Sequence, residues 1–320
     1  MIEISTSIQD AKTLLEKDEI VAIPAETVYG LAGNIFSETA IQKIFETKKR
    51  PSYNPLIVHI DSIEKLDQIV SEIPDKAKVL AAAFWPGSLT LVLNKRNTVP
   101  DSITAGKNTV AVRVPNHPMT LALLQSLDFP LAAPSANPFG SISPTSAQHV
   151  AEYFESSVKM VLDGDICTNG IESTIVGFEK EEAVLYRLGA ISVEDIESLI
   201  GPLKRQTQND ISPKAPGMLS RHYAPRTKII LTTDLPLCVE QNQNSKVGVI
   251  SFTKSDLPGT ISAIEILSEK GNLKEASKNL YAAMHRLDKL NLDIIIATYF
   301  PENDLGNSIN DRLLRATKTI

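Results

Sequence analysis

Four basic side chains of this sequence lie where a positive charge is costly. Arg113 and Arg187 fall inside short apolar segments that are typical of strands, and Lys48 and Arg50 lie where a helical pattern ends. A buried guanidinium needs an anionic partner, and its planar fork suits a carboxylate or a phosphate. The preference of a helix C-terminus for cations explains part of the Lys48 and Arg50 cluster.

The anionic partner of each arginine could be internal or could be a ligand. An internal partner would be an acidic neighbour such as Glu26 or Glu172, and for a single arginine this structural interpretation is the more frequent one. Arg113 and Arg187 belong to the same predicted domain, which also carries a serine-rich loop. The combination favours a bound phosphate or carboxylate.

A second group of candidate residues carries hydroxyl and amide side chains that suit phosphate oxygens or a small polar substrate. A single Ser or Thr more often makes a turn or cap bond. Two of the group lie in a loop with three prolines at 134–145, where Thr145 and Gln148 predict a capping box that starts a helix. The group consists of Thr27, Asn54, Thr109, Ser135, Ser143, Ser173 and Thr174.

The histidines divide by their surroundings. His59 lies in a predicted strand, where it could orient a ligand or be a satisfied core residue, and the residues alone favour the core. His149 and His285 fall on predicted helices, and we expect both side chains to face solvent. His222 lies in a polar segment beside an aromatic residue and cations, which indicates a segment that docks on another surface.

These residues must be positioned by two domains. Residues 1–203 alternate strands and helices, with some strands in succession, which predicts a mixed sheet covered by helices, α/β or α+β. Residues 204–226 are polar and rich in proline, and a loop of that length inside one domain is unusual, so we predict a linker. Residues 227–320 have a Rossmann-like α/β rhythm but no G-x-G-x-x-G, so no dinucleotide is assigned.

Composition excludes several classes of protein. The 320 residues carry a net charge of -6, so the surface as a whole does not attract nucleic acid. The two cysteines lie far apart, no segment is apolar and long enough to span a membrane, and no signal peptide is visible. We therefore expect a cytoplasmic protein. Walker A, zinc-binding and G-x-S-x-G motifs are absent.

Several short motifs occur together and in order along the chain. They are PAETVYGL at 24–31, KKRP at 48–51, NPLIVH at 54–59, FWPG at 84–87, VAVRVP at 110–115, APSAN at 133–137, GIESTIV at 170–176 and YRLGA at 186–190. With these motifs the sequence resembles the YrdC-like L-threonylcarbamoyladenylate synthases. The segments PGM at 216–218 and RHYAP at 221–225 resemble the two-domain form of that family.

The resemblance implies a fold and a reaction. The fold would be a twisted mixed sheet with a concave, positively charged cavity, followed by a smaller Rossmann-like domain. The enzyme would be a nucleotidyltransferase that converts ATP, L-threonine and bicarbonate to threonylcarbamoyl-AMP and pyrophosphate. This is the first step of threonylcarbamoyladenosine formation in tRNA, and the product would pass to a tRNA threonylcarbamoyltransferase.

The resemblance also assigns roles to particular residues. Mg²⁺ would be bound mainly through the ATP phosphates, with no dedicated protein ligands, and the linker would act as a lid over the nucleotide. Catalysis is assigned to Lys48, Arg50 and Arg113. The threonine site would consist of Thr27, His59, Arg113, Ala133 and Ser173, and the ATP site of Arg50, Asn54, Thr109, Ser135, Ser143, Arg187 and Tyr223.

One alternative belongs to another functional class. The basic run at 48–50 could mark a module that binds double-stranded RNA or tRNA without nucleotide turnover. The acidic net charge and the 5% aromatic content argue against a stacking platform for nucleic acid. Weak tRNA binding beside an enzymatic activity stays open.

Overall fold

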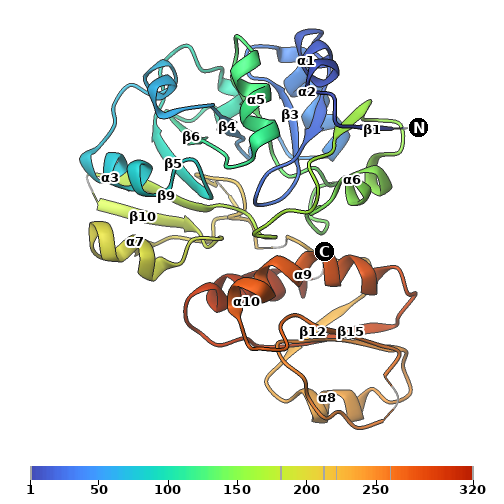
Figure 1. Cartoon of the computed structure of the whole chain (residues 1–320). Coiled ribbons are helices and arrows are strands. Elements are labelled where there is room, and N and C mark those ends of the chain that lie inside the picture. The colour runs from blue at the N-terminus through green and yellow to red at the C-terminus, as the bar shows by residue number, and fades with distance from the viewer. Residues whose placement is uncertain (1, 181, 212, 221, 260, 319–320) are drawn as a thin grey trace.

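The chain folds into a large N-terminal domain and a small C-terminal domain (Figure 1). The structure, a computed structural model, describes residues 2–180, 182–211, 213–220, 222–259 and 261–318. Arg221 of the predicted linker motif lies outside the described residues. Among the described helices, none is both long enough and apolar enough to cross a membrane.

A mixed sheet forms the centre of the N-terminal domain. Its strand order in the described part of the chain is β1-β8-β2-β3-β7-β4-β6-β5-β9-β10-β11, with parallel and antiparallel neighbours. The strands are β1 Glu3–Ser5, β2 Val21–Ile23, β3 Gly30–Asn34, β4 Ile57–His59, β5 Leu89–Asn94, β6 Thr109–Arg113, β7 Leu131–Ala132, β8 Met160–Leu162, β9 Thr174–Glu179, β10 Glu182–Arg187 and β11 Lys204–Arg205. The predicted mixed sheet is confirmed.

Helices cover this sheet, and several begin at a serine cap. The Ser37 side chain accepts from Ala40 N and starts α2, and Ser192 starts α7 in the same way through Asp195 N. The capping box predicted at Thr145 is wrong by one residue, because Ser146 accepts from His149 N. The helices are α1 Ile8–Glu16, α2 Glu38–Lys48, the 3₁₀ helix η1 Ile63–Gln68, α3 Asp75–Phe84, α4 Asp101–Thr104, α5 Pro118–Ser126, α6 Ala147–Phe154 and α7 Val193–Ile200.

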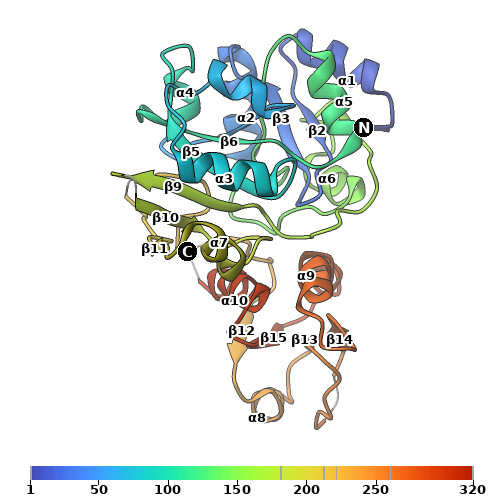
Figure 2. The same ribbon diagram turned by 60° about the vertical axis from the view of Figure 1, so that its left-hand side comes forward.

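The C-terminal domain is a parallel sheet with helices on both faces. Its strands are β12 Ile229–Thr232, β13 Val247–Ser251, β14 Ala263–Ile266 and β15 Ile294–Thr298, in the order β12-β15-β13-β14. Helices α9 (Leu273–Asp288) and α10 (Leu305–Ala316) lie between this sheet and the N-terminal domain, and α8 (Leu235–Gln241) covers the opposite face (Figures 1 and 2). This arrangement agrees with the predicted Rossmann-like rhythm.

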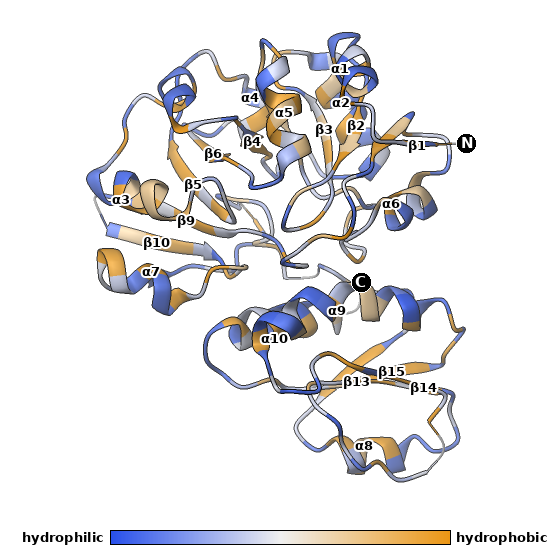
Figure 3. Ribbon diagram, viewed as in Figure 1, coloured by the Kyte–Doolittle hydropathy of each residue, from blue (hydrophilic) through white to orange (hydrophobic). Residues whose placement is uncertain are grey.

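The apolar core is continuous across the two domains. The strands of both sheets are largely hydrophobic, whereas the helices have one apolar and one polar side (Figure 3). One buried cluster joins Val28 and Ile142 of the N-terminal domain to Leu280 and Met284 of α9. Burial of apolar area across a domain boundary resists relative motion of the domains, and this shared cluster docks α9 on the N-terminal domain.

Two histidines that we expected to face solvent lie in the interface between the domains. The rings of His149 on α6 and His285 on α9 stack with centroids 3.9 Å apart and an interplanar angle of 20°. Burial, with a smaller contribution from His285, lowers the pKa of His149 to about 3. Burial also lowers the pKa of His285 to about 4. Both rings are therefore neutral near pH 7, which permits the stack, and the sequence-based expectation is wrong.

The predicted linker is partly structured. Its first residues form β11, which pairs in parallel with β10 and extends the N-terminal sheet. Further along, Ala215 and Met218 are buried against Val92 and Tyr186 of the same sheet. The segment thus packs along the N-terminal domain before it enters the C-terminal one.

Candidate active site

A cavity lies between the strand ends of the N-terminal sheet and the linker. It brings together every residue predicted for the amino acid, namely Thr27, His59, Arg113, Ala133 and Ser173. Of the residues predicted for the nucleotide, it is lined by Arg50, Ser135, Arg187 and Tyr223. The cavity also has linker residues Pro216, Gly217 and His222 in its wall.

Arg113 is fixed at one end of the cavity by three partners. Its Nε donates to Gly87 O at 3.0 Å, one Nη donates to Thr27 Oγ1 at 2.9 Å, and the other forms a salt bridge with Glu26. The internal acidic partner considered from the sequence is therefore present. Each Nη carries two N–H groups, so donors remain for a carboxylate in the cavity.

Glu26 holds this arginine while remaining charged. Burial would raise the pKa of Glu26, but the Arg113 guanidinium and hydrogen bonds from Ser88 and Asn116 outweigh burial and keep that pKa below its usual value. An ionised carboxylate on one side of Arg113 fixes the plane of the guanidinium. Its unused edge can then act as a rigid carboxylate clamp.

His59 lies beside Arg113 because β4 and β6 are parallel neighbours and these two residues are register partners at their ends. Burial, followed by the charge of Arg113, lowers the pKa of His59 to about 3, so the ring is neutral. Its Nδ1 is 3.3 Å from Ile57 O. A carbonyl oxygen only accepts, so the proton lies on Nδ1 and Nε2 is left as an acceptor.

The opposite end of the cavity contains arginines without acidic partners. Arg50 donates only to backbone, with Nε 3.2 Å from Asn54 O and Nη2 2.8 Å from Pro55 O. Arg187 donates to Ser173 O, Ser173 Oγ and Pro216 O at 3.0, 2.9 and 3.4 Å. Neither arginine forms a salt bridge with any carboxylate that the structure describes.

Burial of these charges without acidic partners lowers the pKa values of the cations. Burial, then the charge of Arg187, lowers the pKa of Arg50 to about 9, and burial likewise lowers the pKa of Arg187. The same cations, after burial itself, depress the pKa of His222 on the linker. A buried excess of positive charge suits the binding of an anion.

Four predicted residues lie outside the cavity wall. Lys48 is buried, and its Nζ donates to the carbonyls of Ser135 and Asn137, so it holds the loop at 134–145. The phosphate contact and the catalytic role predicted for Lys48 would require it to leave those carbonyls. Ser143 Oγ instead donates to Glu172 Oε1 at 2.6 Å.

The other two residues outside the wall, Asn54 and Thr109, differ in their distance from the site: Asn54 is adjacent to a wall residue and Thr109 is remote. Asn54 is fully buried next to Arg50, and both polar atoms of its side chain lack hydrogen-bond partners among the described residues. Thr109 begins β6, at the opposite end of that strand from Arg113, and lines a separate surface depression with Asp75 and Lys180.

Sequence reasoning missed the residues that the C-terminal domain brings to the site. Glu172 lines the cavity and bonds to Tyr281 of α9 and Arg312 of α10. The available signal was the spacing of Arg312 and Arg315 on the buried face of a predicted amphipathic helix. A buried arginine on such a face indicates a contact with another part of the molecule.

The donors in this cavity do not form a metal cage. In the described segments no three His, Cys, Asp or Glu side chains gather in a way that could hold a metal ion. The carboxylate in the wall, Glu172, is already bonded by Ser143, Tyr281 and Arg312. The arrangement suits anions with oriented hydroxyl and guanidinium donors.

Comparisons with known proteins show the family of this chain. The family model Sua5_yciO_yrdC, described as "Telomere recombination", matches residues 13–189, and the model "Threonylcarbamoyl-AMP synthase, C-terminal domain" matches residues 191–317. Proteins named threonylcarbamoyl-AMP synthase from Pyrococcus abyssi and Bacillus subtilis are each 39% identical, over 97% and 98% of this chain and 94% of each relative.

One solved structure matches nearly the whole chain, and another matches only part of it. The crystal structure of Pyrococcus abyssi Sua5 complexed with L-threonine aligns with a TM-score of 0.91 and 37% identity, covering 99% of this chain and 97% of that one. The crystal structure of Escherichia coli YciO aligns with a TM-score of 0.53 and 20% identity over 61% of this chain and 98% of that one. The second match shows that the fold of the N-terminal domain also occurs without the C-terminal domain.

Proposed function

The chain belongs to the Sua5/YciO/YrdC family and carries the C-terminal domain of threonylcarbamoyl-AMP synthases, and we propose that it converts ATP, L-threonine and bicarbonate to threonylcarbamoyl-AMP and pyrophosphate. Threonine and bicarbonate combine to a carbamate with loss of water. A carbamate oxygen then attacks the α-phosphorus of ATP, and pyrophosphate leaves. The product serves the formation of threonylcarbamoyladenosine in tRNA, through an acceptor enzyme that transfers the threonylcarbamoyl group.

The observation that carries this proposal is the division of one cavity into two halves. Arg113, with its plane fixed by Glu26, offers free donors for the threonine carboxylate. The neutral His59 offers an acceptor, Nε2, for a hydroxyl or amine of the same substrate. Arg50 and Arg187 offer two uncompensated charges for phosphates. Holding two anions close together in a preorganised site is the main catalytic task of this reaction.

The rival RNA-binding interpretation loses its motivation. In the basic run at 48–50, Lys48 and Arg50 are buried, and only Lys49 is exposed. A buried cation cannot contact an RNA backbone at the surface. Mg²⁺ would be held mainly by ATP and would supply neutralisation of phosphate charge, since the described residues offer no cluster of His, Cys, Asp or Glu to hold it.

The reaction is tested by pyrophosphate release from the full chain. We expect release to require ATP, threonine and bicarbonate together, and to fall when valine replaces threonine, because valine lacks the hydroxyl for His59 Nε2. A rate that does not depend on the amino acid would contradict the assignment of the threonine half.

The linker closes the cavity, and we propose that it opens to admit ATP. Linker residues Gly217 and Tyr223 form part of the wall. Beyond them Ala224 N donates to Gly140 O at 2.8 Å, and Ala224 forms a parallel β-bridge with Ser141. A lid of this kind excludes water from a labile carbamate.

A disulfide across this bridge tests the lid. Paired backbones lie about 5 Å apart, within reach of a disulfide, so the double variant Ser141→Cys, Ala224→Cys can lock the linker. We expect the oxidised form to turn over ATP at least about tenfold more slowly, since opening precedes each cycle, and dithiothreitol to restore the rate. Each single variant, treated with the same oxidant, is the control. Equal rates in the oxidised and reduced double variant would contradict a moving lid.

A further inference from the structure

Helix α10 of the C-terminal domain presents a polar face that is completely buried. Ser308, Arg312 and Arg315 follow one another at spacings of four and three residues, so they share one side of the helix. The side chains of Arg312 and Arg315 are 0% and 1% exposed. Charged groups are buried in this way only where partners meet them, so this face is an interface with the N-terminal domain and the linker.

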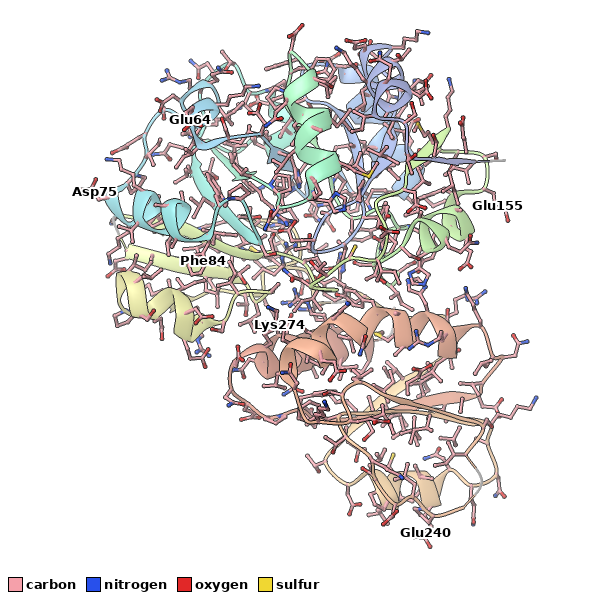
Figure 4. The ribbon with its side chains drawn as sticks, in the orientation of Figure 1. Glu64, Asp75, Phe84, Glu155, Glu240 and Lys274 are labelled. Atoms are coloured by element: carbon pink, nitrogen blue, oxygen red, sulfur yellow. The ribbon has the colours of Figure 1, made fainter. Side chains whose placement is uncertain are left out.

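Each residue of this face has a partner outside its own domain. Ser308 Oγ donates to Gly189 O at 2.8 Å, and Arg315 donates to Leu219 O and Thr207 O of the linker at 2.6 and 2.9 Å. Arg312 reaches further, toward the cavity itself. Figure 4 draws the side chains of α9 beside the N-terminal domain, with Lys274 marking the first turn of that helix.

Arg312 contacts two residues of the cavity wall but does not itself line the cavity. Its Nε and Nη2 donate to Glu172 Oε2 at 3.3 and 3.2 Å. Its Cζ lies 5.2 Å from the centre of the Tyr223 ring, within the range of a cation–π interaction. Tyr281 supports the same pair, since its hydroxyl donates to Glu172 Oε2 at 2.9 Å and its ring lies 5.7 Å from that of Tyr223.

The Tyr223 ring depends on these neighbours for its position. Its backbone φ is 64°, in the left-handed region that aromatic residues rarely adopt. Its hydroxyl is buried and finds no hydrogen-bond partner among the described residues. The ring is therefore held by the groups packed against it, namely Arg312, Tyr281 and the adjacent His222, while its hydroxyl stays available in the cavity wall.

The charge on Glu172 couples Arg312 to Arg187, because both arginines act on this carboxylate. Burial would raise the pKa of Glu172, but the charges of Arg312 and Arg187, in that order, and the Ser143 hydrogen bond lower it, so the carboxylate is ionised. Arg187 forms no salt bridge in the described structure, although it is close enough to Glu172 to feel its charge. Without Arg312, Glu172 would be a buried anion on which Arg187 exerts the largest remaining cationic influence.

We propose that Arg312 is a positioning residue for the nucleotide half of the site: it pairs with Glu172 and stacks on Tyr223, and thereby leaves Arg187 unpaired for the nucleotide phosphates. The C-terminal domain then sets nucleotide affinity without touching substrate. This inference rests on the proposed function for the identity of the anion. It goes beyond that function in assigning a role to the second domain.

The test is ATP binding to the full chain, measured by calorimetry with Mg²⁺, beside threonine binding measured separately. We expect Arg312→Met to weaken ATP binding about tenfold or more, because a buried charged partner is lost, and to leave threonine affinity within about twofold of the unmodified chain. Arg286→Met is the matched control, since Arg286 lies on α9 of the same domain and pairs with Glu265 at the surface.

A rescue experiment separates positioning from a merely structural role. In the double variant Glu172→Gln, Arg312→Met both buried charges are gone, so Arg187 is again unpaired, and we expect ATP binding to recover at least threefold, or about 0.65 kcal/mol, relative to Arg312→Met. A merely structural defect would lower and then restore threonine affinity together with ATP affinity, so both affinities are measured in both variants. ATP affinity of Arg312→Met equal to that of Arg286→Met, or absence of rescue with normal threonine affinity, would overturn the proposal.

A second substitution keeps the proposal testable if Arg312→Met fails to fold. Arg312→Lys keeps the charge beside Glu172 but not the planar fork that stacks on Tyr223, and we expect about a threefold loss of ATP affinity with threonine affinity preserved. Unchanged ATP affinity, or loss of threonine affinity in both Arg312 variants, would overturn the positioning role. If the unmodified chain binds neither ATP nor threonine, it is the proposed function that fails.

Discussion

Arg113→Ala is expected to reduce threonine-dependent pyrophosphate release by about a hundredfold to a thousandfold, the effect of removing one partner of a buried charged pair. The substitution removes the donors for the threonine carboxylate. It also leaves Glu26, next to the same half, as a buried carboxylate without its cationic partner. A second negative charge then repels the substrate where a positive charge had attracted it.

The measurement is the initial rate at limiting and saturating threonine, together with ATP affinity. We expect ATP affinity to change little, because Arg50 and Arg187 are not in contact with Arg113. Arg96→Ala is the control, since Arg96 is exposed and donates only to a backbone carbonyl. An unchanged rate at limiting threonine would remove the carboxylate clamp from the account.

Arg50→Met is expected to weaken ATP binding without lowering thermal stability. ATP affinity should fall about a hundredfold, because charge-assisted hydrogen bonds to phosphate are among the strongest that a site can offer. The melting temperature should stay the same or rise. The substitution removes two hydrogen bonds to backbone carbonyls, but it also removes a buried cation whose pKa burial has already lowered to about 9.

Calorimetry measures the ATP affinity, and a thermal melt of the same preparations measures the melting temperature. Lys49→Met is the matched control, because Lys49 is the exposed neighbour of Arg50 and no role in the cavity is proposed for it. A lower melting temperature with unchanged ATP affinity would mean that Arg50 is a structural cation, and that the nucleotide half lies elsewhere.

The family resemblance assigned the residues of the amino-acid half, and the sheet explains why they meet in one cavity. His59 and Arg113 end two parallel strands in register, and Thr27 follows another strand end in the same sheet. Parallel strands bring the residues after their carboxyl ends to one edge. Short motifs that end strands therefore report a common site even when they are far apart in the sequence.

The nucleotide half was less predictable because its partners come from remote segments. Lys48 carries the residue type and position of a phosphate ligand, yet its ammonium group is bonded to the carbonyls of Ser135 and Asn137. Whether a cation faces a cavity or a carbonyl depends on side-chain direction, which spacing along the chain does not determine.

The interface between the domains was even harder to predict from spacing along the chain. His149 and His285 occupy helices whose polar positions indicate solvent, and their burial follows only from the docking of α9 against α6. Arg312 lies 140 residues from its partner Glu172. Helical periodicity predicts which residues share a face but not what covers that face.

The central claim is that one cavity joins a carbamate of threonine to AMP, and the most direct test is to identify the product. The full chain is incubated with ATP, Mg²⁺, threonine and ¹³C-labelled bicarbonate, and the products are analysed by mass spectrometry. The account predicts threonylcarbamoyl-AMP that contains the label, formed in step with pyrophosphate and absent when any one substrate is omitted. Unlabelled threonyl-AMP, or pyrophosphate formed without threonine, would contradict it.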